Sequence, residues 1–206
     1  MVRVGAGLGI EKVRITGGEP LVRRGVVAFL AELKRLPGLA DVSLTTNGVL
    51  LERHLPALQA AGVRRLNISL DTLDRERYRQ ITGRDHLPEV WRAVEAALAA
   101  GFRPVKLNVV VMKGVNDDEV PRLAALARDL PLHVRFIEFM PMGCAQEHAA
   151  RFVPNHQVRQ QVETLGGLVP AEGPGDQGPA ERWRFADGAG EIGFISPISH
   201  HFCGRC

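Results

Sequence analysis

The sequence predicts an α/β fold, a partial TIM-like barrel of parallel strands with a C-terminal extension that carries a Cys pair. Three observations predict it. Short β-branched runs alternate with segments of helical period, glycines follow the helical segments where C-caps are expected, and four of the runs share one division into a polar and an apolar face. Successive strand and helix units build a parallel sheet with right-handed crossovers, in a TIM-like barrel or a doubly wound sheet.

The expected strands are spaced by about one strand and helix unit each. The expected ranges are Lys12 to Thr16, Asp41 to Thr46, Arg65 to Asp71, Pro104 to Met112 and His133 to Phe139. Between them, apolar residues recur at helical spacing, as from Val26 to Leu36 and from Val90 to Leu98. Acidic residues from Asp117 to Glu119 fit the first turn of a further helix, where the helix dipole favours them.

This rhythm fails after about Gly143. One helix is expected from Asn155 to Leu165, then an exposed loop at 172–179 and two short strands, Arg182 to Phe185 and Glu191 to Ile195. We therefore expect a barrel core over residues 1–143, with its first strand missing. Residues 144–206 are expected to form an extension that packs on this core.

Composition excludes several classes of protein. Of the 206 residues, 45% are hydrophobic and 24% are charged, as in ordinary globular chains. Aromatic residues make up 5%, too few for stacking platforms, so no nucleic-acid partner is expected. The net charge of +3 is diffuse but adequate for a small anionic ligand. No membrane span and no signal peptide are recognisable, which predicts a cytoplasmic protein.

Polar side chains alternate with apolar ones along four of the expected strands. In a buried parallel sheet both faces are normally apolar, so the polar face is expected to line a cavity. Its cations need an anionic ligand with several phosphates, because Asp71 is the one obvious compensating charge. Edge strands with a solvated polar face are the alternative. The residues of the polar face are Lys12, Arg14 and Thr16, then Ser43, Thr45 and Asn47, then Asn67, Ser69 and Asp71, then Lys106 and Asn108.

Arg135 on the fifth strand adds a further cation. Arg135 and Met140 differ in parity, so both face the cavity only if a bulge or the end of the strand intervenes. Two turns end strands and precede helices, Thr16 to Pro20 and Thr45 to Gly48. Their glycines and exposed amides are able to approach a ligand closely, although simple strand-to-helix geometry also explains each turn.

Cys203 and Cys206 form a C-x-x-C pair. This spacing fits half a zinc site, an iron–sulfur ligand pair or a redox dithiol. Further ligands would have to come from elsewhere. Cys144, His200 and His201 are the local alternatives, and we interpret them as a lone thiol and two surface or packing residues.

The motifs together resemble the radical S-adenosylmethionine enzymes and, within them, the GTP 3′,8-cyclase family of molybdenum cofactor biosynthesis. The matching stretches cover almost the whole chain in order. They are VRITGGEP (13–20), LTTNG (44–48), NISLD (67–71), KLNV (106–109), KGVND (113–117), RFIEFM (135–140) and FCGRC (202–206). The family is a class of lyases that uses [4Fe–4S] clusters and S-adenosylmethionine, so no catalytic side chain is expected.

The resemblance implies roles for particular residues. Gly18, Ser69 and Met140 would contact S-adenosylmethionine, and Glu19 would support its amino group. Cys203 and Cys206 would be two of three protein ligands of a second [4Fe–4S] cluster. The residues expected to contact GTP are Arg14, Thr45 and Lys106, with Lys12 and Arg135 as further partners.

The resemblance also implies a reaction and its partners. GTP would be converted to (8S)-3′,8-cyclo-7,8-dihydroguanosine 5′-triphosphate, and a cyclic pyranopterin monophosphate synthase would act downstream. A homodimer is one expected assembly. The family's first cluster needs a C-x-x-x-C-x-x-C motif that this sequence lacks. We therefore expect a fragment, inactive alone. The alternatives are another radical S-adenosylmethionine enzyme, such as a peptide-maturation enzyme, and a non-catalytic anion-binding barrel module.

Overall fold

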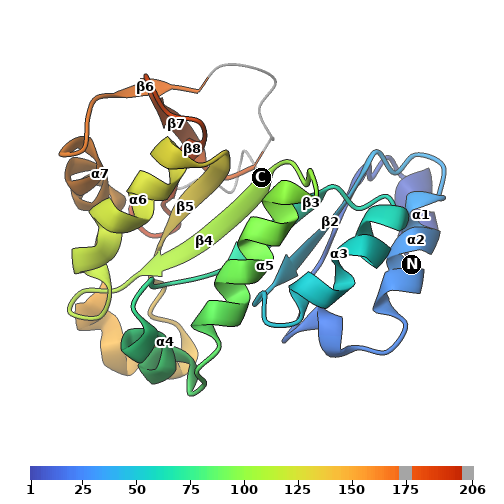
Figure 1. Ribbon diagram of the computed structural model, residues 1–206, viewed down its shortest axis with the longest axis horizontal. Coiled ribbons are helices and arrows are strands. Elements are labelled where there is room, and N and C mark those ends of the chain that lie inside the picture. Colours follow the sequence, from blue (N-terminus) through green and yellow to red (C-terminus); the bar gives the residue numbers. More distant parts are fainter. Residues whose placement is uncertain (172–177, 201–206) are drawn as a thin grey trace. The chain divides into compact units, whose positions relative to one another are not determined.

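The computed structural model describes residues 1–171 and 178–200. These residues form two compact units (Figure 1). Unit 1 comprises Met1–Ser69 and His86–Lys106, and unit 2 comprises Leu70–Asp85 and the chain from Leu107 on. The division passes through one strand, β4 (Val105–Val111). This division groups residues that pack compactly together and does not separate a barrel core from an extension. The expected boundary near residue 143 therefore stays a prediction.

Unit 1 contains a parallel sheet. Its strands are β1 (Lys12–Ile15), β2 (Asp41–Thr46) and β3 (Arg65–Ser69). The start of β4 lies beside β3, where the Leu66 N–H donates to the Pro104 carbonyl at 3.2 Å. Among the described residues β1 is an end strand of the sheet.

Three helices of unit 1 cover the apolar face of this sheet (Figure 1), namely α2 (Val26–Lys34), α3 (Leu51–Ala60) and α5 (Leu87–Ala99). Leu44 and Leu66 on the strands, and Leu58 and Val90 on the helices, are fully buried. Gly48 marks how closely the two layers approach, because a Cβ there would lie 3.0 Å from Val90. The other helical elements are α1 (Val2–Gly7) and the short 3₁₀ helix η1 (Pro20–Val22).

Unit 2 contains the rest of β4 and four further strands. β5 (Leu132–Glu138) pairs in parallel with β8 (Glu191–Ile195), although β8 is also one arm of an antiparallel hairpin with β7 (Glu181–Phe185). β6 (Leu168–Pro170) pairs antiparallel with β7. The C-terminal hairpin therefore extends the sheet of this unit through β8.

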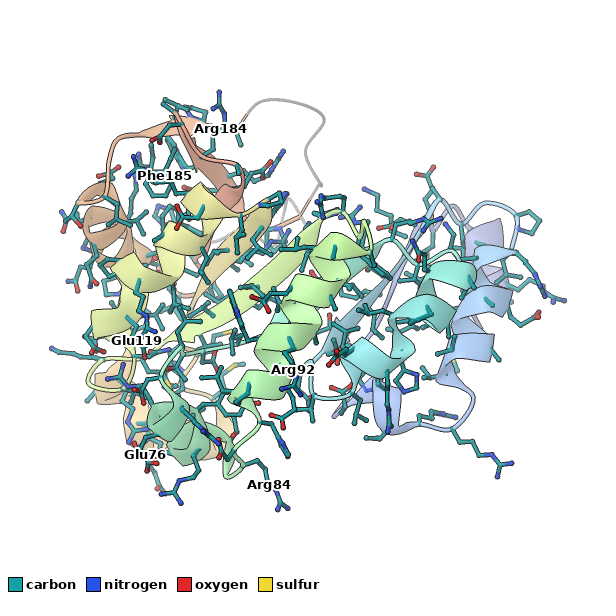
Figure 2. All side chains as sticks on the ribbon, in the orientation of Figure 1. Glu76, Arg84, Arg92, Glu119, Arg184 and Phe185 are labelled. Atoms are coloured by element: carbon teal, nitrogen blue, oxygen red, sulfur yellow. The ribbon has the colours of Figure 1, made fainter. Side chains whose placement is uncertain are left out.

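The core of unit 2 lies between this sheet and its helices. Val134 and Phe136 of β5 are fully buried together with Leu123 of α6 and Val158 of α7. Phe185 of β7, labelled in Figure 2, belongs to the same cluster and is 1% exposed. The helical elements are α4 (Arg75–Thr82), the 3₁₀ segments η2 (Asp117–Glu119) and η3 (Gly143–Arg151), α6 (Val120–Asp129) and α7 (Asn155–Glu163).

The predicted fold class is confirmed: the chain is α/β with a mostly parallel sheet that does not close in the described residues. All five predicted strands exist, but Asp71, Met112 and Phe139 lie just beyond the strands to which the pattern assigned them. β6 was not expected, since three residues are too few for a periodic signal. No helix of the described residues is long and apolar enough to cross a membrane.

Candidate functional site

The turn after β1 is built around the carboxylate of Glu19. Gly17 has φ of 149°, a conformation that a side chain strains, so this position needs glycine. Glu19 Oε1 accepts the Leu21 N–H at 2.9 Å, which caps η1, and the Thr46 hydroxyl at 2.9 Å. Glu19 Oε2 accepts the Asn47 N–H at 2.6 Å. One carboxylate therefore joins the two turns that the sequence singles out.

This turn also has room for a ligand. A carboxylate has about four acceptor positions, and the three hydrogen bonds to Glu19 leave one on Oε2 for a further donor. A Cβ placed on Gly18 would meet no atom within 4 Å, so nothing in the described chain requires glycine there. A cavity of about 480 Å³ lies against the turn, lined also by Arg23, Arg24 and Phe29.

The polar face predicted for unit 1 exists. In the parallel register Lys12 lies opposite Asp41, Arg14 opposite Ser43, and Thr45 opposite Asn67. Lys12 and Arg14 are exposed, Thr45 is half-buried and Asn67 is 3% exposed. The alternative of a solvated edge therefore describes β1, while the neighbouring strands carry buried polar groups.

Asp41 is a counter-charge on this face that the sequence analysis missed. Its carboxylate pairs with Arg65 of β3 at 3.0 Å. The signal was present, since Asp41 opens a strand whose alternate residues are polar. Lys106, also in unit 1, is 2% exposed, which places a cation deep in the unit. A buried cation is a common feature of sites for anionic ligands.

The Asn67 amide adds a buried acceptor to unit 1. Its Nδ2 donates to the Leu44 carbonyl at 3.2 Å, and its Oδ1 accepts no hydrogen bond from the described residues. Unpaired buried acceptors are costly, and a ligand donor commonly satisfies them. Ser69, the last residue of β3, is exposed.

Two predicted site residues, Arg135 and Met140, lie in unit 2. Arg135 of β5 is 6% exposed and lies opposite Gly193 of β8. A Cβ on Gly193 would lie 3.1 Å from the Arg135 side chain, so glycine leaves room for the arginine. Met140 is 41% exposed and follows the end of β5. The strict alternation of side chains therefore no longer applies at Met140, which is one of the two ways in which it was expected to face the same side as Arg135.

Asp71 is half-buried and contacts the backbone of β4. Its carboxylate accepts the Val110 N–H at 2.8 Å. Burial raises the pKa of Asp71, and the Val110 hydrogen bond opposes that rise in part. The buried Asn116 amide reinforces the same segment by donating to the Asp71 carbonyl at 2.7 Å. Asp71 thus fastens the end of β4, and its expected role as a counter-charge for the cations stays a prediction.

A neighbouring carboxylate, Glu119, fixes the residues that follow Asp71. It is 7% exposed and lies just before α6, where Figure 2 labels it. It accepts the Leu73 N–H at 2.9 Å and the Thr72 hydroxyl at 2.5 Å, and it pairs with Arg77. From the sequence, Glu119 was expected only to interact with the helix dipole. Its actual partners lie 46 and 47 residues away in the chain, and the residues around Glu119 do not indicate them.

The predicted metal ligands Cys203 and Cys206 lie outside the described residues. Within the described part of the chain, no group of three or more His, Cys, Asp or Glu side chains is arranged to hold a metal ion. The assignment of the Cys pair therefore stays a prediction.

The fold defines an α/β protein in which strands of a parallel sheet end in glycine-containing turns, and these turns are the candidate ligand site. Residues 1–127 match the family model of the radical SAM superfamily, and the chain belongs to this superfamily. Residues 132–206 match a second model, Molybdenum Cofactor Synthesis C.

The chain is also similar to curated relatives. The chain is 49% identical over 206 residues to a GTP 3′,8-cyclase of Moorella thermoacetica, with 100% of this chain and 64% of the relative covered. It is 50% identical over 211 residues to a GTP 3′,8-cyclase of Heliobacterium modesticaldum, at the same coverage. The chain thus spans about 64% of the length of these relatives.

Solved structures share the fold at low sequence identity. Streptococcus suis SuiB, bound to S-adenosylmethionine, matches with a TM-score of 0.64 and 17% identity over 80% of this chain and 37% of that one. A domain of a pyruvate-formate lyase-activating enzyme from Bacteroides vulgatus matches with a TM-score of 0.59 and 18% identity, covering 74% and 91%. At these identities the likeness concerns the fold alone.

Proposed function

We propose that the full-length protein containing this chain is a GTP 3′,8-cyclase of molybdenum cofactor biosynthesis. It converts GTP to (8S)-3′,8-cyclo-7,8-dihydroguanosine 5′-triphosphate. The relatives named GTP 3′,8-cyclase support the proposal, because their matches run through the whole chain. The observation that carries it is the polar face of unit 1, where Lys12, Arg14 and the buried Lys106 supply positive charge for a triphosphate.

S-adenosylmethionine fits the turn after β1. The free acceptor position on Glu19 Oε2 suits the ammonium group of S-adenosylmethionine. The open space at Gly18 lets the protein backbone and the ligand approach each other closely. Ser69 and Met140 complete the proposed contacts. When bound and given one electron by a [4Fe–4S] cluster, S-adenosylmethionine would supply a 5′-deoxyadenosyl radical and release methionine. The residues of this chain bind and orient the cofactor and GTP and neutralise charge.

The cysteines of this chain fit one of the two iron–sulfur clusters of the proposed protein and not the other. Its three cysteines contain no C-x-x-x-C-x-x-C motif, so these residues do not fit the first cluster. Cys203 and Cys206 have the thiolate chemistry and the spacing of an iron–sulfur ligand pair, so they fit as two ligands of the second cluster. We therefore propose that the 206 residues alone do not start the radical reaction.

The remaining parts of the proposal concern contacts and context. Thr45 supplies a hydroxyl for GTP in unit 1, and Arg135 is proposed as a further GTP contact. The protein acts in the cytoplasm as a homodimer, and a cyclic pyranopterin monophosphate synthase consumes the product.

The test is anaerobic titration of the full-length protein with GTP and S-adenosylmethionine, followed by mass spectrometry of the product. Arg14→Ala and Lys106→Ala each remove one charged contact, so GTP affinity should fall about tenfold or more while S-adenosylmethionine affinity stays unchanged. Arg35→Ala is the matched control, because Arg35 lies after α2 with its side chain 75% exposed.

The outcome distinguishes the alternatives. Unchanged GTP affinity in both variants would remove the proposed role of the polar face. A wild-type protein that modifies a peptide and leaves GTP intact would indicate a different radical S-adenosylmethionine enzyme. A protein that binds anions but forms no product after cluster reconstitution would indicate a binding module.

A further inference from the structure

Glu138, the last residue of β5, is a buried carboxylate that the proposed chemistry does not use. It is 1% exposed, and no basic side chain of the described residues pairs with it. Its oxygens accept four hydrogen bonds from two distant segments. Asn155 N–H donates to Oε1 at 2.9 Å, and the N–H groups of Ile198 and Ser199 donate to Oε2 at 3.0 Å each. The Ser199 hydroxyl also donates to Oε1.

Asn155 holds the same segment from the other side. Its Nδ2 donates to the Ile195 carbonyl at 2.8 Å and to the Ser196 hydroxyl oxygen at 2.9 Å. The His200 N–H then donates to the Ser196 carbonyl at 3.0 Å, which closes a turn. The chain from the end of β8 to His200 is therefore fixed by two polar side chains that are each at least nine-tenths buried.

The chemistry of this cluster requires a carboxylate. Four donors converge on two oxygen atoms, and only an ionised carboxylate offers two acceptor oxygens with no donor of its own. A glutamine at position 138 would direct its NH₂ group at one or two of these donors. Burial raises the pKa of Glu138, but the hydrogen bonds from Ser199, Asn155 and Ile198 outweigh it, and the net shift is downward.

The hydrogen bonds of Glu138 lie close in the sequence to two predicted site residues. Cys203 follows Ser199 by four residues, and β5 also carries Arg135, three residues before Glu138. We propose that Glu138 is a positioning residue, which fixes the start of the cysteine-bearing C-terminal segment against the end of β5. The inference rests on the proposed function only for the role of the two cysteines as cluster ligands near GTP.

The test uses the full-length protein with reconstituted clusters. Glu138→Gln keeps the side-chain shape but removes at least one charged acceptor, so hydrogen exchange of the amides at 195–200 should accelerate about tenfold or more. GTP affinity should fall by a similar factor, and the electron paramagnetic resonance spectrum of the reduced cluster with GTP should change. S-adenosylmethionine affinity should stay within about twofold, because no direct contact is lost.

Two further variants keep the inference falsifiable. Ser199→Ala removes one of the four hydrogen bonds on an exposed residue and should give a smaller effect of the same kind, even if Glu138→Gln fails to fold. Glu163→Gln makes the same chemical change on α7, where Glu163 pairs with Arg159 and is 40% exposed, and should change nothing.

Each result decides between the ideas. Unchanged hydrogen exchange of the amides at 195–200 in both Glu138→Gln and Ser199→Ala overturns the inference. Faster exchange with an unchanged GTP affinity and spectrum overturns the positioning role, because the contact would then be merely structural. A wild-type protein that binds no GTP defeats the proposed function instead, and the exchange data still report on the Glu138 contacts.

Discussion

The Glu19 carboxylate is the connection whose removal tests the site most directly. Glu19→Ala removes three hydrogen bonds to a charged acceptor, donated by Leu21, Thr46 and Asn47. Leu21 and Thr46 are buried, so water replaces the lost acceptor poorly there, whereas the exposed Asn47 amide is readily solvated. Buried donors left unpaired cost about 1–3 kcal/mol each, and an N-cap contributes about 1 kcal/mol.

The sum predicts that Glu19→Ala lowers the free energy of unfolding by about 3 kcal/mol and Tm by about 6–12 °C. Glu19→Gln keeps one acceptor oxygen, so about 1 kcal/mol is expected. Urea unfolding measures both values. In a Trp183→Phe background, Trp91 of α5 is the tryptophan that remains in this chain, and it reports on unit 1.

Glu32→Ala is the matched control. Glu32 lies on α2 in the same unit, with its side chain 70% exposed in a pair with Arg35. Such a surface pair contributes less than about 1 kcal/mol. If Glu19→Ala costs no more than Glu32→Ala, the Glu19 carboxylate does not hold the two turns together.

Three further predictions concern other positions. Gly18→Ala should leave Tm unchanged, because a Cβ there meets open space, but should weaken S-adenosylmethionine binding in a titration of the full-length protein; equal affinity would refute the close approach. Gly190→Ala would place a Cβ 2.0 Å from the Leu132 carbonyl oxygen, so thermal unfolding should show that the free energy of unfolding falls by about 1–3 kcal/mol or more. A decrease no larger than that of the surface variant Glu32→Ala would contradict the geometry. The raised pKa of Asp71 means that the folded state binds its proton more tightly than the unfolded chain, so the carboxylate costs stability as pH rises above its ordinary 3.8. Asp71→Asn retains an acceptor for Val110, and urea unfolding should show the variant gaining on the wild type as the pH rises above about 4; a constant difference would show that the pKa of Asp71 is not raised in the folded state.

The sequence by itself determined the local features of this protein. Alternating polar and apolar residues located β2 to the residue, because side chains on a strand alternate strictly between two faces. The same alternation placed Arg14, Thr45 and Asn67 on the polar face. The Gly-Gly-Glu-Pro motif identified the turn after β1 in the same way, since glycine and proline restrict the backbone locally.

Only the tertiary structure decided which distant groups meet. The sequence predicted β7 and β8 as two short strands, but not that β8 pairs in parallel with β5, a strand more than 50 residues away. The same holds for Glu19 with Thr46, and for Glu138 with Ser199, 61 residues away. Local periodicity tells which way a side chain faces, whereas the partner of a buried carboxylate depends on which donors the packed elements leave unsatisfied beside it.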